Sequence, residues 1–191
     1  MSRAVTAMNR NWILWALLLA FSLAGASRTY AQSQESATGD WSSLSVGGTV
    51  SATRLQYGQH WLYGGSVFAD ANFTWHYGIE GETNWAVLHQ LENTHATTYL
   101  IGPRYQLAGL GQDARLRPYA KFLVGDGYFN FPYNYAWGNY FVMAPGAGLD
   151  YRVNPRIRLR LFDVEVQYWP GFTYGSMTNL NVSTGVRYTI R

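Results

Sequence analysis

The sequence predicts an all-β fold, an eight-stranded antiparallel up-and-down transmembrane β-barrel. Three observations lead to this prediction. Between residues 43 and 191, apolar and polar residues alternate with a period of two, as in strands with two unlike faces. Eight such segments are present, each long enough for the ~9–11 residues of a tilted membrane strand. The charges on the polar faces add to zero, which predicts an apolar outside and a polar, neutral lumen.

The first four expected strands span residues 43–55, 62–76, 79–89 and 96–106. The clearest alternation is in the third, where Glu80 and Glu82 lie on one face and Trp85 and Val87 on the other. In the second, Val67 alternates with polar residues, and a tight turn at Tyr77-Gly78 follows. In the fourth, Tyr99 and Ile101 lie opposite Thr98 and Arg104. Each of these segments therefore has a lipid-type face and a lumen-type face.

The last four expected strands span residues 115–125, 139–153, 157–168 and 180–191. A turn at 108–114 precedes the first of them, and Asn154-Pro155 marks a turn after the second. The segment 157–168 departs from the rule that the charged residues of a strand share one face, because its two arginines lie on one face and its acidic residues on the other. A regular strand would send one set into lipid, at ~2–4 kcal/mol for a basic side chain. We therefore expect a β-bulge near Leu161-Phe162 that resets the phase; alternatively, one of the two sets lies beyond the bilayer.

The ends of the strands carry two further signals. The connections after the first, third, fifth and seventh strands are expected to be longer, with 126–138 the longest, and the turns at the other end shorter, as in outer-membrane barrels. Aromatic residues near the shorter-turn end fall in phase in four strands, which predicts an aromatic girdle. They are Trp75, Tyr105, Tyr151 and Tyr188.

The N-terminus predicts a cleaved secretory signal peptide over residues 1–31, followed by a flexible segment, 32–42, and the barrel domain, 43–191. Arg3 and Arg10 precede an uncharged run, Trp12 to Ala26, that is too short for a spanning helix. Cleavage is expected after Ala31 or, alternatively, after Ala26. Three of the 14 basic residues lie in this leader, so 11 basic residues face 11 acidic ones in the remainder. The neutral balance gives no electrostatic reason to expect nucleic-acid binding.

Twelve charged side chains are predicted to point into the lumen and to pair across it. An eight-stranded barrel has an interior just wide enough for side chains to fill, and buried charges need partners. We favour a structural plug, with a proton relay, a gate or an active site as alternatives. The six acids and six bases are Asp70, Glu80, Glu82, Asp150, Asp163, Glu165, Arg104, Arg117, Lys121, Arg158, Arg160 and Arg187.

No catalytic or metal-binding pattern is apparent, so we expect a protein that is not an enzyme and has no cofactor and no metal. Some eight-stranded outer-membrane barrels act on lipid A through a surface histidine, a serine and a carboxylate. His60, His76, His89 and His95 have no serine two positions away on the same face. An aromatic-rich connection between the fifth and sixth strands could instead contact an external ligand or surface partner, or extend the hairpin. Its residues are Tyr128, Phe129, Phe131, Tyr133, Tyr135 and Trp137.

Four stretches resemble the OmpA/OmpX-like superfamily of small outer-membrane barrels: residues 99–105, 117–125, 145–151 and 156–160. The most specific part is the strand Gly146-x-Gly148-x-Asp150-Tyr151, followed by a turn and an arginine-bearing strand. The resemblance implies a bacterial outer-membrane location, contact with outer-membrane lipids and the barrel-insertion machinery, and a role in envelope structure or surface contact. We expect only the barrel, without a peptidoglycan-binding domain. The ending Tyr188-Thr189-Ile190-Arg191 departs from the aromatic terminus usual in that superfamily.

Two other functions remain as alternatives. A lipid A-modifying outer-membrane enzyme would need one of the four histidines to act in catalysis. A soluble, secreted ligand-binding barrel would have a polar exterior and an apolar interior, which is the reverse of the pattern in this sequence.

Overall fold

The computed structural model describes residues 43–56, 61–88, 94–111, 114–130, 137–172 and 175–190. The expected signal peptide and the segment 32–42 lie outside these residues, as does the final Arg191. Within the described ranges, no helix is long and apolar enough to cross a membrane.

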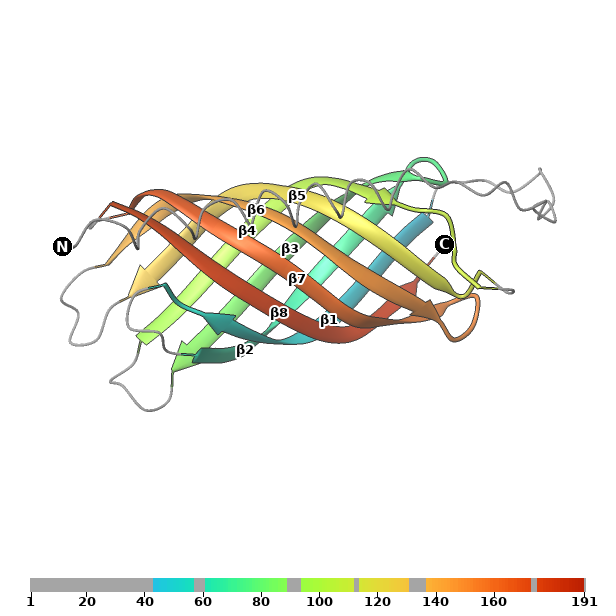
Figure 1. The fold of residues 1–191 in the computed structure, drawn as a ribbon, viewed down its shortest axis with the longest axis horizontal. Helices are drawn as coiled ribbons and strands as arrows, with labels where there is room; N and C mark the ends of the chain where they lie inside the picture. The colour runs from blue at the N-terminus through green and yellow to red at the C-terminus, as the bar shows by residue number, and fades with distance from the viewer. Residues whose placement is uncertain are drawn as a thin grey trace, which may run out of the picture. The chain divides into compact units, whose positions relative to one another are not determined.

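Eight antiparallel strands form a closed barrel in which each strand pairs with its neighbours in sequence and β1 pairs with β8 (Figure 1). The predicted fold class is confirmed. Both Ser43 and Thr189 lie at one end, which we call the terminal end; the opposite end is the loop end. The strands are β1 (Ser43–Arg54), β2 (Trp61–Asn72), β3 (Tyr77–Leu88), β4 (Thr94–Gln106), β5 (Leu116–Asn130), β6 (Trp137–Arg152), β7 (Ile157–Phe172) and β8 (Gly175–Thr189).

The two faces of the strands differ as the alternation predicts. In β1, Val46 and Val50 are exposed while Ser45 and Thr49 are buried. The same division holds around the barrel, so the outside is apolar and the buried interior holds most of the polar and charged side chains. A closed barrel pairs every strand and leaves no open edge. This exterior contradicts the alternative of a soluble barrel with a polar outside.

The connection between β2 and β3 lies four residues earlier than predicted. Residues 73–76 form the turn, and Tyr77 and Gly78 already belong to β3. The backbone N–H of Tyr77 donates to the hydroxyl of Thr74, at 3.0 Å, and the carbonyl of Tyr77 accepts from the backbone of Phe73. Gly78 serves close packing instead of the turn, because a Cβ there would lie 2.5 Å from Oδ1 of Asn72.

This shift also moves Trp75 out of the predicted girdle. Tyr105 and Tyr188 lie on the outward face near the terminal end, as expected. Trp75 instead sits in the turn, and its ring lies 4.6 Å from the guanidinium of Arg117, a buried lumen residue. A cation over an aromatic face is favourable. Trp75 therefore contacts the rim of the lumen.

The second half of the barrel is taller than predicted. Strands β5 to β8 have 15 or 16 residues, against 12 or 13 in β1 to β4. The prediction of a long connection over 126–138 is wrong, because Asp126 to Asn130 pair with Phe141 to Trp137 in the β5–β6 ladder. The longest connection instead follows β4, between Gln106 and Leu116. The lengths of the connections therefore do not distinguish the two ends of the barrel. The loop end is distinguished by its extended hairpins.

The irregularity predicted in β7 is present. Leu149 of β6 pairs with Phe162, and the next residue, Asp150, pairs with Arg160, so Leu161 is an extra residue. Leu161 and Phe162 are both exposed, whereas Arg160 and Asp163 are both buried. The bulge therefore allows arginines before it and acids after it to point into the same lumen.

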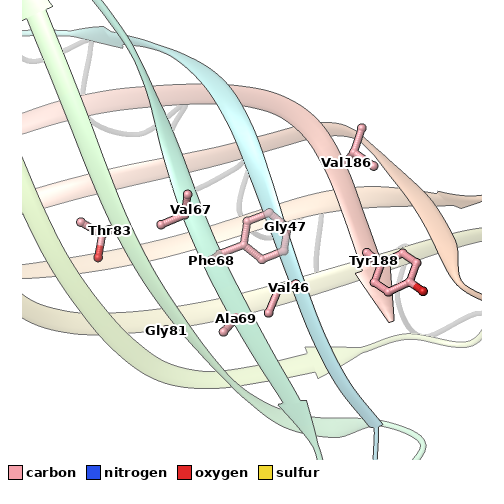
Figure 2. A pocket seen from close by; sticks show the side chains of 9 residues that line it. All are labelled: Val46, Gly47, Val67, Phe68, Ala69, Gly81, Thr83, Val186 and Tyr188. Atoms are coloured by element: carbon pink, nitrogen blue, oxygen red, sulfur yellow. The ribbon is translucent and has the colours of Figure 1, made fainter. Parts of the chain in front are cut away.

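A shallow apolar hollow lies on the outer face of β1, β2, β3 and β8 (Figure 2). Its floor is made by Ala69 and Gly81, which are paired directly across β2 and β3. Val46, Val67 and Tyr188 rise around these small residues. Most of its lining lies on the lipid-type face, and the inward-facing pair Gly47 and Phe68 also contributes to it.

Deleting Leu161 should remove the bulge. Either the arginines or the acids of β7 would then face the outside, which costs roughly 2–4 kcal/mol for each basic side chain at mid-depth. We expect the deletion variant to lose the compact, heat-sensitive form on an unboiled denaturing gel after refolding in detergent. Leu161→Ala keeps the residue count and should retain that form. A deletion variant that folds as well as the wild type would contradict this role of the bulge.

Candidate functional site

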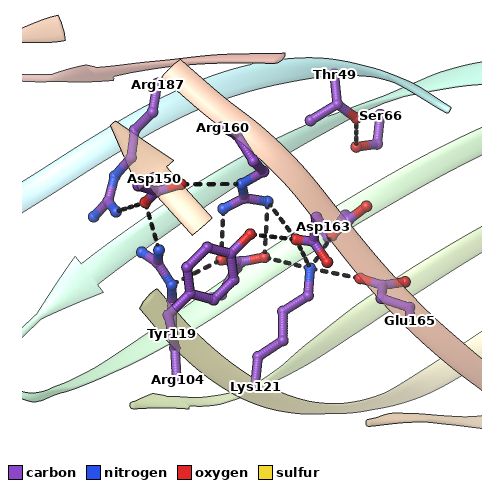
Figure 3. A network of polar contacts seen from close by, with 12 residues as sticks. Thr49, Ser66, Arg104, Tyr119, Lys121, Asp150, Arg160, Asp163, Glu165 and Arg187 are labelled. Atoms are coloured by element: carbon purple, nitrogen blue, oxygen red, sulfur yellow. Dashed lines mark hydrogen bonds and ion pairs between the residues drawn. The ribbon is translucent and has the colours of Figure 1, made fainter. Parts of the chain in front are cut away.

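The interior of the barrel holds a charged cluster in its terminal half. It is built by inward-facing positions of seven strands, since β1 contributes no charged side chain there. All six predicted acids and four of the six predicted bases make ion pairs in this cluster. Figure 3 labels seven of these side chains, which converge in the lumen from different strands: Arg104, Lys121, Asp150, Arg160, Asp163, Glu165 and Arg187. We call these ten residues the lumen cluster.

Lys121 of β5 lies among four carboxylates. Its Nζ is 2.8 Å from Glu80 and 2.9 Å from Glu82, both on β3. On the other side, Nζ is 2.8 Å from Asp163 and 2.5 Å from Glu165, both on β7. Its side chain is completely buried. One ammonium group therefore ties together two strands that are not neighbours in the sheet.

A second group of ion pairs lies nearer the terminal end. Nη2 of Arg104 is 2.7 Å from Asp150, and its Nη1 is 3.4 Å from Asp70. Arg187 contacts the same two acids, with Nε 2.9 Å from Asp70 and Nη1 3.0 Å from Asp150. Two arginines and two aspartates from β2, β4, β6 and β8 thus form a four-membered ring. Shared partners of this kind satisfy more of each guanidinium than a single pair does.

Arg160 joins the two groups. Its Nη2 lies 3.0 Å from Glu80, on the opposite wall, and its Nη1 lies 3.1 Å from Asp163. The guanidinium also lies 3.7 Å above the ring of Phe68. Because Glu80 also contacts Lys121 and Arg104, it receives three cations. Glu80 is therefore the carboxylate that connects the whole cluster.

Two aromatic residues, Phe68 and Tyr119, belong to the site although the sequence reasoning did not include them. The hydroxyl of Tyr119 donates to Asp163, at 2.6 Å, and Arg104 lies 4.0 Å above its ring. Each aromatic residue is paired directly with a glycine, Phe68 with Gly47 and Tyr119 with Gly148. A Cβ on either glycine would collide with the facing ring. Glycine opposite an inward aromatic residue is the signal that could have identified them, once the register was known.

Arg117 and Arg158 are the two predicted lumen bases outside the ion pairs described above. Arg117 is buried beneath the ring of Trp75. Arg158 is half-buried and makes no ion pair with any described residue within 4.0 Å. Both lie at the terminal end. The lumen cluster therefore contains six acids and four bases, and the two remaining bases lie at the mouth next to it.

An apolar cap fills the loop end of the lumen. Its largest members are Trp169 and Phe172 of β7 and Phe129 of β5, all at most 3% exposed. The ring of Phe129 meets those of Trp169 and Phe172 edge-on, with centroids 6.4 and 5.8 Å apart. Polar uncharged residues separate this cap from the lumen cluster; Asn84, Thr98 and Gln167 are examples. The lumen therefore changes from charged to polar to apolar along its length.

The position of Phe129 corrects its predicted role as a contact for an external partner. β5 continues to Asn130, so the alternation carries Phe129 inward. Tyr128 points the other way, is half-buried, and packs against His95 with centroids 5.7 Å apart and ring planes tilted by 31°. Phe131, Tyr133 and Tyr135 lie outside the described residues, and so does the side chain of Trp137.

The histidines show no catalytic arrangement in the described part of the chain. His76 stacks on Tyr105, with centroids 5.6 Å apart, and His95 packs on Tyr128. His60 and His89 lie outside the described residues. Among the residues that the structure describes, no group of three or more His, Asp or Glu side chains could hold a metal ion. The chemistry that the lumen geometry can perform is mutual neutralisation of buried charge.

Comparison with known proteins identifies the fold. No protein-family model matches the sequence, and no curated protein matches it significantly. The structure is similar to that of Neisserial surface protein A, with a TM-score of 0.53 and 14% identity over 77% of this chain and 96% of that chain. OprG from Pseudomonas aeruginosa has 12% identity over 78% of this chain and 96% of its own, with a TM-score of 0.49. Ail, the attachment invasion locus protein of Yersinia pestis, has 16% identity over 77% and 97%, with a TM-score of 0.48. The chain thus has the fold of a small outer-membrane β-barrel.

Replacing Lys121 with methionine should destabilise the barrel strongly. The variant leaves four buried carboxylates without their shared cation, and removal of one partner from a buried ion pair typically costs about 3–5 kcal/mol. The free energy of unfolding, measured by urea titration in detergent, should fall by at least about 3 kcal/mol. Adding Glu82→Gln and Glu165→Gln to the variant should restore part of the loss. Arg104→Ala should also destabilise, because Asp70 and Asp150 lose a partner.

Arg54→Ala is the matched control for these variants. Arg54 is exposed at the loop end of β1, so its removal should change the unfolding free energy by less than about 1 kcal/mol. Equal stability of the Lys121→Met variant and this control would show that the lumen cluster does not hold the barrel together.

Proposed function

We propose that this protein is a non-enzymatic β-barrel of the bacterial outer membrane, with a closed lumen, that serves envelope structure or surface contact. The observation that carries the proposal is the inverted polarity of a closed barrel. Large apolar residues are exposed on its outside, including Val50 and Tyr63, each 66% exposed, while charged residues fill its inside. Such an exterior suits hydrocarbon, in which a closed barrel satisfies every backbone hydrogen bond. Outer-membrane lipids are accordingly its expected surroundings, and the barrel-insertion machinery its expected route there.

The filled lumen supports a structural role over transport. The lumen cluster occupies the terminal half, and the apolar cap occupies the loop end, so the two layers obstruct the axis in succession. An eight-stranded barrel is narrow, and channels of useful width need ~16 strands. Lys121 contacts four carboxylates, and Glu80, Arg104, Asp150 and Arg160 have three charged partners each, so these residues are also poorly placed to move with a passing ion.

The loop end supports a role in surface contact. There the hairpins β5–β6 and β7–β8 extend beyond the first four strands, and β5 and β6 remain paired as far as Asn130 and Trp137. In the proposed orientation these hairpins stand outside the cell. We propose that the aromatic-rich stretch of the sequence from Tyr128 to Trp137, which includes Phe131, Tyr133 and Tyr135, contacts an external ligand or partner.

Cell fractionation combined with a gel-shift assay tests the proposal. We expect the protein in the outer-membrane fraction of the producing cell, released only by detergent, with a faster mobility when unboiled than when boiled. Detergent-resistant closed barrels behave in this way because they stay folded in the gel until heated. A protein released from the periplasm without detergent, and without a mobility shift, would refute the membrane location. Altered lipid A acylation after replacement of His60, His76, His89 or His95 by alanine would refute the absence of catalysis.

A further inference from the structure

Three buried polar atoms near the apolar cap have no hydrogen-bond partner among the described residues. They are Nδ2 of Asn84, Oγ1 of Thr98 and Nε1 of Trp169. Each of these residues is at most 4% exposed, so bulk solvent does not serve the three atoms. A buried polar group without a partner is costly, and most such groups in native proteins are paired with protein or with ordered water. The three atoms therefore indicate a bound partner that they share.

The register of the strands brings these atoms together. Asn84 of β3 is paired directly with Thr98 of β4, and Thr98 is paired with Gly127 of β5, so the three residues form one row. Directly opposed residues share a face, with Cβ atoms ~4.5–5.5 Å apart. The indole of Trp169, from β7, lies over Gly127, where a Cβ would come 2.3 Å from its Cη2. The indole thus occupies the place beside Thr98 that a side chain at position 127 would take.

The same residues line a cavity of about 10 Å³ at the boundary between the polar uncharged residues and the apolar cap. Leu55 and Ala86 of the cap contribute to its lining. So do Gln167 of β7 and Asn179 of β8, which are paired directly. The volume is close to the ~10–15 Å³ that one water molecule needs. A larger ligand does not fit.

The polar atoms around the cavity match the hydrogen bonds of a water molecule. Asn84 and Trp169 present N–H groups, which only donate, and a water oxygen can accept both. The hydroxyl of Thr98 can accept one hydrogen of the water. The amide oxygen of Gln167 can accept the other, since the amide nitrogen of this residue already donates to Glu165, at 3.4 Å. Two donors and two acceptors are the full complement of one water.

The nearby charges favour a neutral molecule over an ion. Glu82 and Glu165 are buried and lie two positions from Asn84 on β3 and from Gln167 on β7. Their carboxylates repel an anion. A cation would need oxygen ligands, whereas Asn84 and Trp169 present N–H groups to the cavity. A neutral molecule that both donates and accepts satisfies every atom.

We propose that Asn84, Thr98, Gln167 and Trp169 bind one ordered water molecule. We call these four residues the water site. The water joins β3 and β4 to the indole on β7, and it thereby ties the apolar cap to the polar residues next to it. The site goes beyond the proposed function, because it belongs to the folded lumen in detergent as well as in a membrane.

Nuclear magnetic resonance of the isotope-labelled full chain, folded in detergent micelles, tests the water site. The indole N–H signal of Trp169 is identified by its loss in Trp169→Phe. We expect it to show a cross-peak with water whose sign differs between NOESY and ROESY spectra, as a long-lived bound water requires. Chemical exchange of the N–H would give the same sign in both. The indole of Trp85, which faces outward, is the matched control and should show no such cross-peak.

Asn84→Leu distinguishes a bound water from the hydroxyl of Thr98, which could relay exchange with the solvent. The leucine fills the cavity and removes a donor, so the cross-peak should disappear while the indole signal of Trp169 remains. The proposal is overturned if the wild type lacks the cross-peak, if Trp85 shows an equal one, or if the cross-peak persists in Asn84→Leu.

Thermal unfolding in the same detergent gives a second test, which does not require Asn84→Leu to fold. Thr98→Val and Trp169→Phe each remove one contact of the water and should lower the Tm. The double variant should lose clearly less than the sum, because either change alone already weakens the binding of the same water. Thr98→Val combined with Trp85→Phe is the control pair and should be additive. Additive losses for Thr98→Val and Trp169→Phe would also overturn the proposal.

Discussion

Glu80 on one wall of the barrel and Arg160 on the opposite wall meet at 3.0 Å in the middle of the lumen. Their charges are fully buried, so each would be very costly without the other. Lys121 and Arg104 contact the same carboxylate from two further strands. A one-residue slip of any of these strands would turn its charge toward the outside and leave the partners uncompensated. The ion pairs therefore determine the strand register more strongly than the alternation of apolar and polar residues could alone.

The rest of the interior follows from the shape of this cluster. Side chains as long as arginine and lysine must cross a narrow lumen, and the glycines at 47 and 148 make room for Phe68 and Tyr119 beside them. The bulge at Leu161 brings the two halves of β7 onto one face, so that Arg160 and Asp163 both reach the cluster. Above it, the longer hairpins carry the aromatic cap. The cap and the cluster close the same lumen by different physical means, dispersion and packing in one and electrostatics in the other.

The alternation in the sequence was sufficient to predict the fold class, the number of strands, the faces of the strands and the bulge. It was sufficient because two physical demands coincide in a membrane barrel: each strand has an apolar and a polar side, and buried charge must sum to zero. It failed at the strand ends. Tyr77-Gly78 resembles a turn locally, yet ladder pairing with β2 and β4 overrides that preference. Phe129 resembles a loop residue because several other aromatic residues follow it, and only the continued pairing of β5 with β6 shows that it is buried. The partner of each charge could not be predicted, because pairing across the lumen depends on which strands lie opposite one another.

The central claim is that paired charges and the apolar cap close the lumen, and electrical recording from single barrels in a planar lipid bilayer tests it most directly. The purified, folded protein is added to the bilayer in about 1 M potassium chloride. At this concentration the salt strongly screens long-range interactions between the ions and the charges of the barrel, so that only physical obstruction of the lumen limits the current. As an independent check of insertion, the protein is reconstituted into vesicles of the same lipid and recovered with them. The account predicts no steady conductance above the bare bilayer. A stable, reproducible conductance step for each inserted barrel would contradict it and would show that the lumen is a pathway.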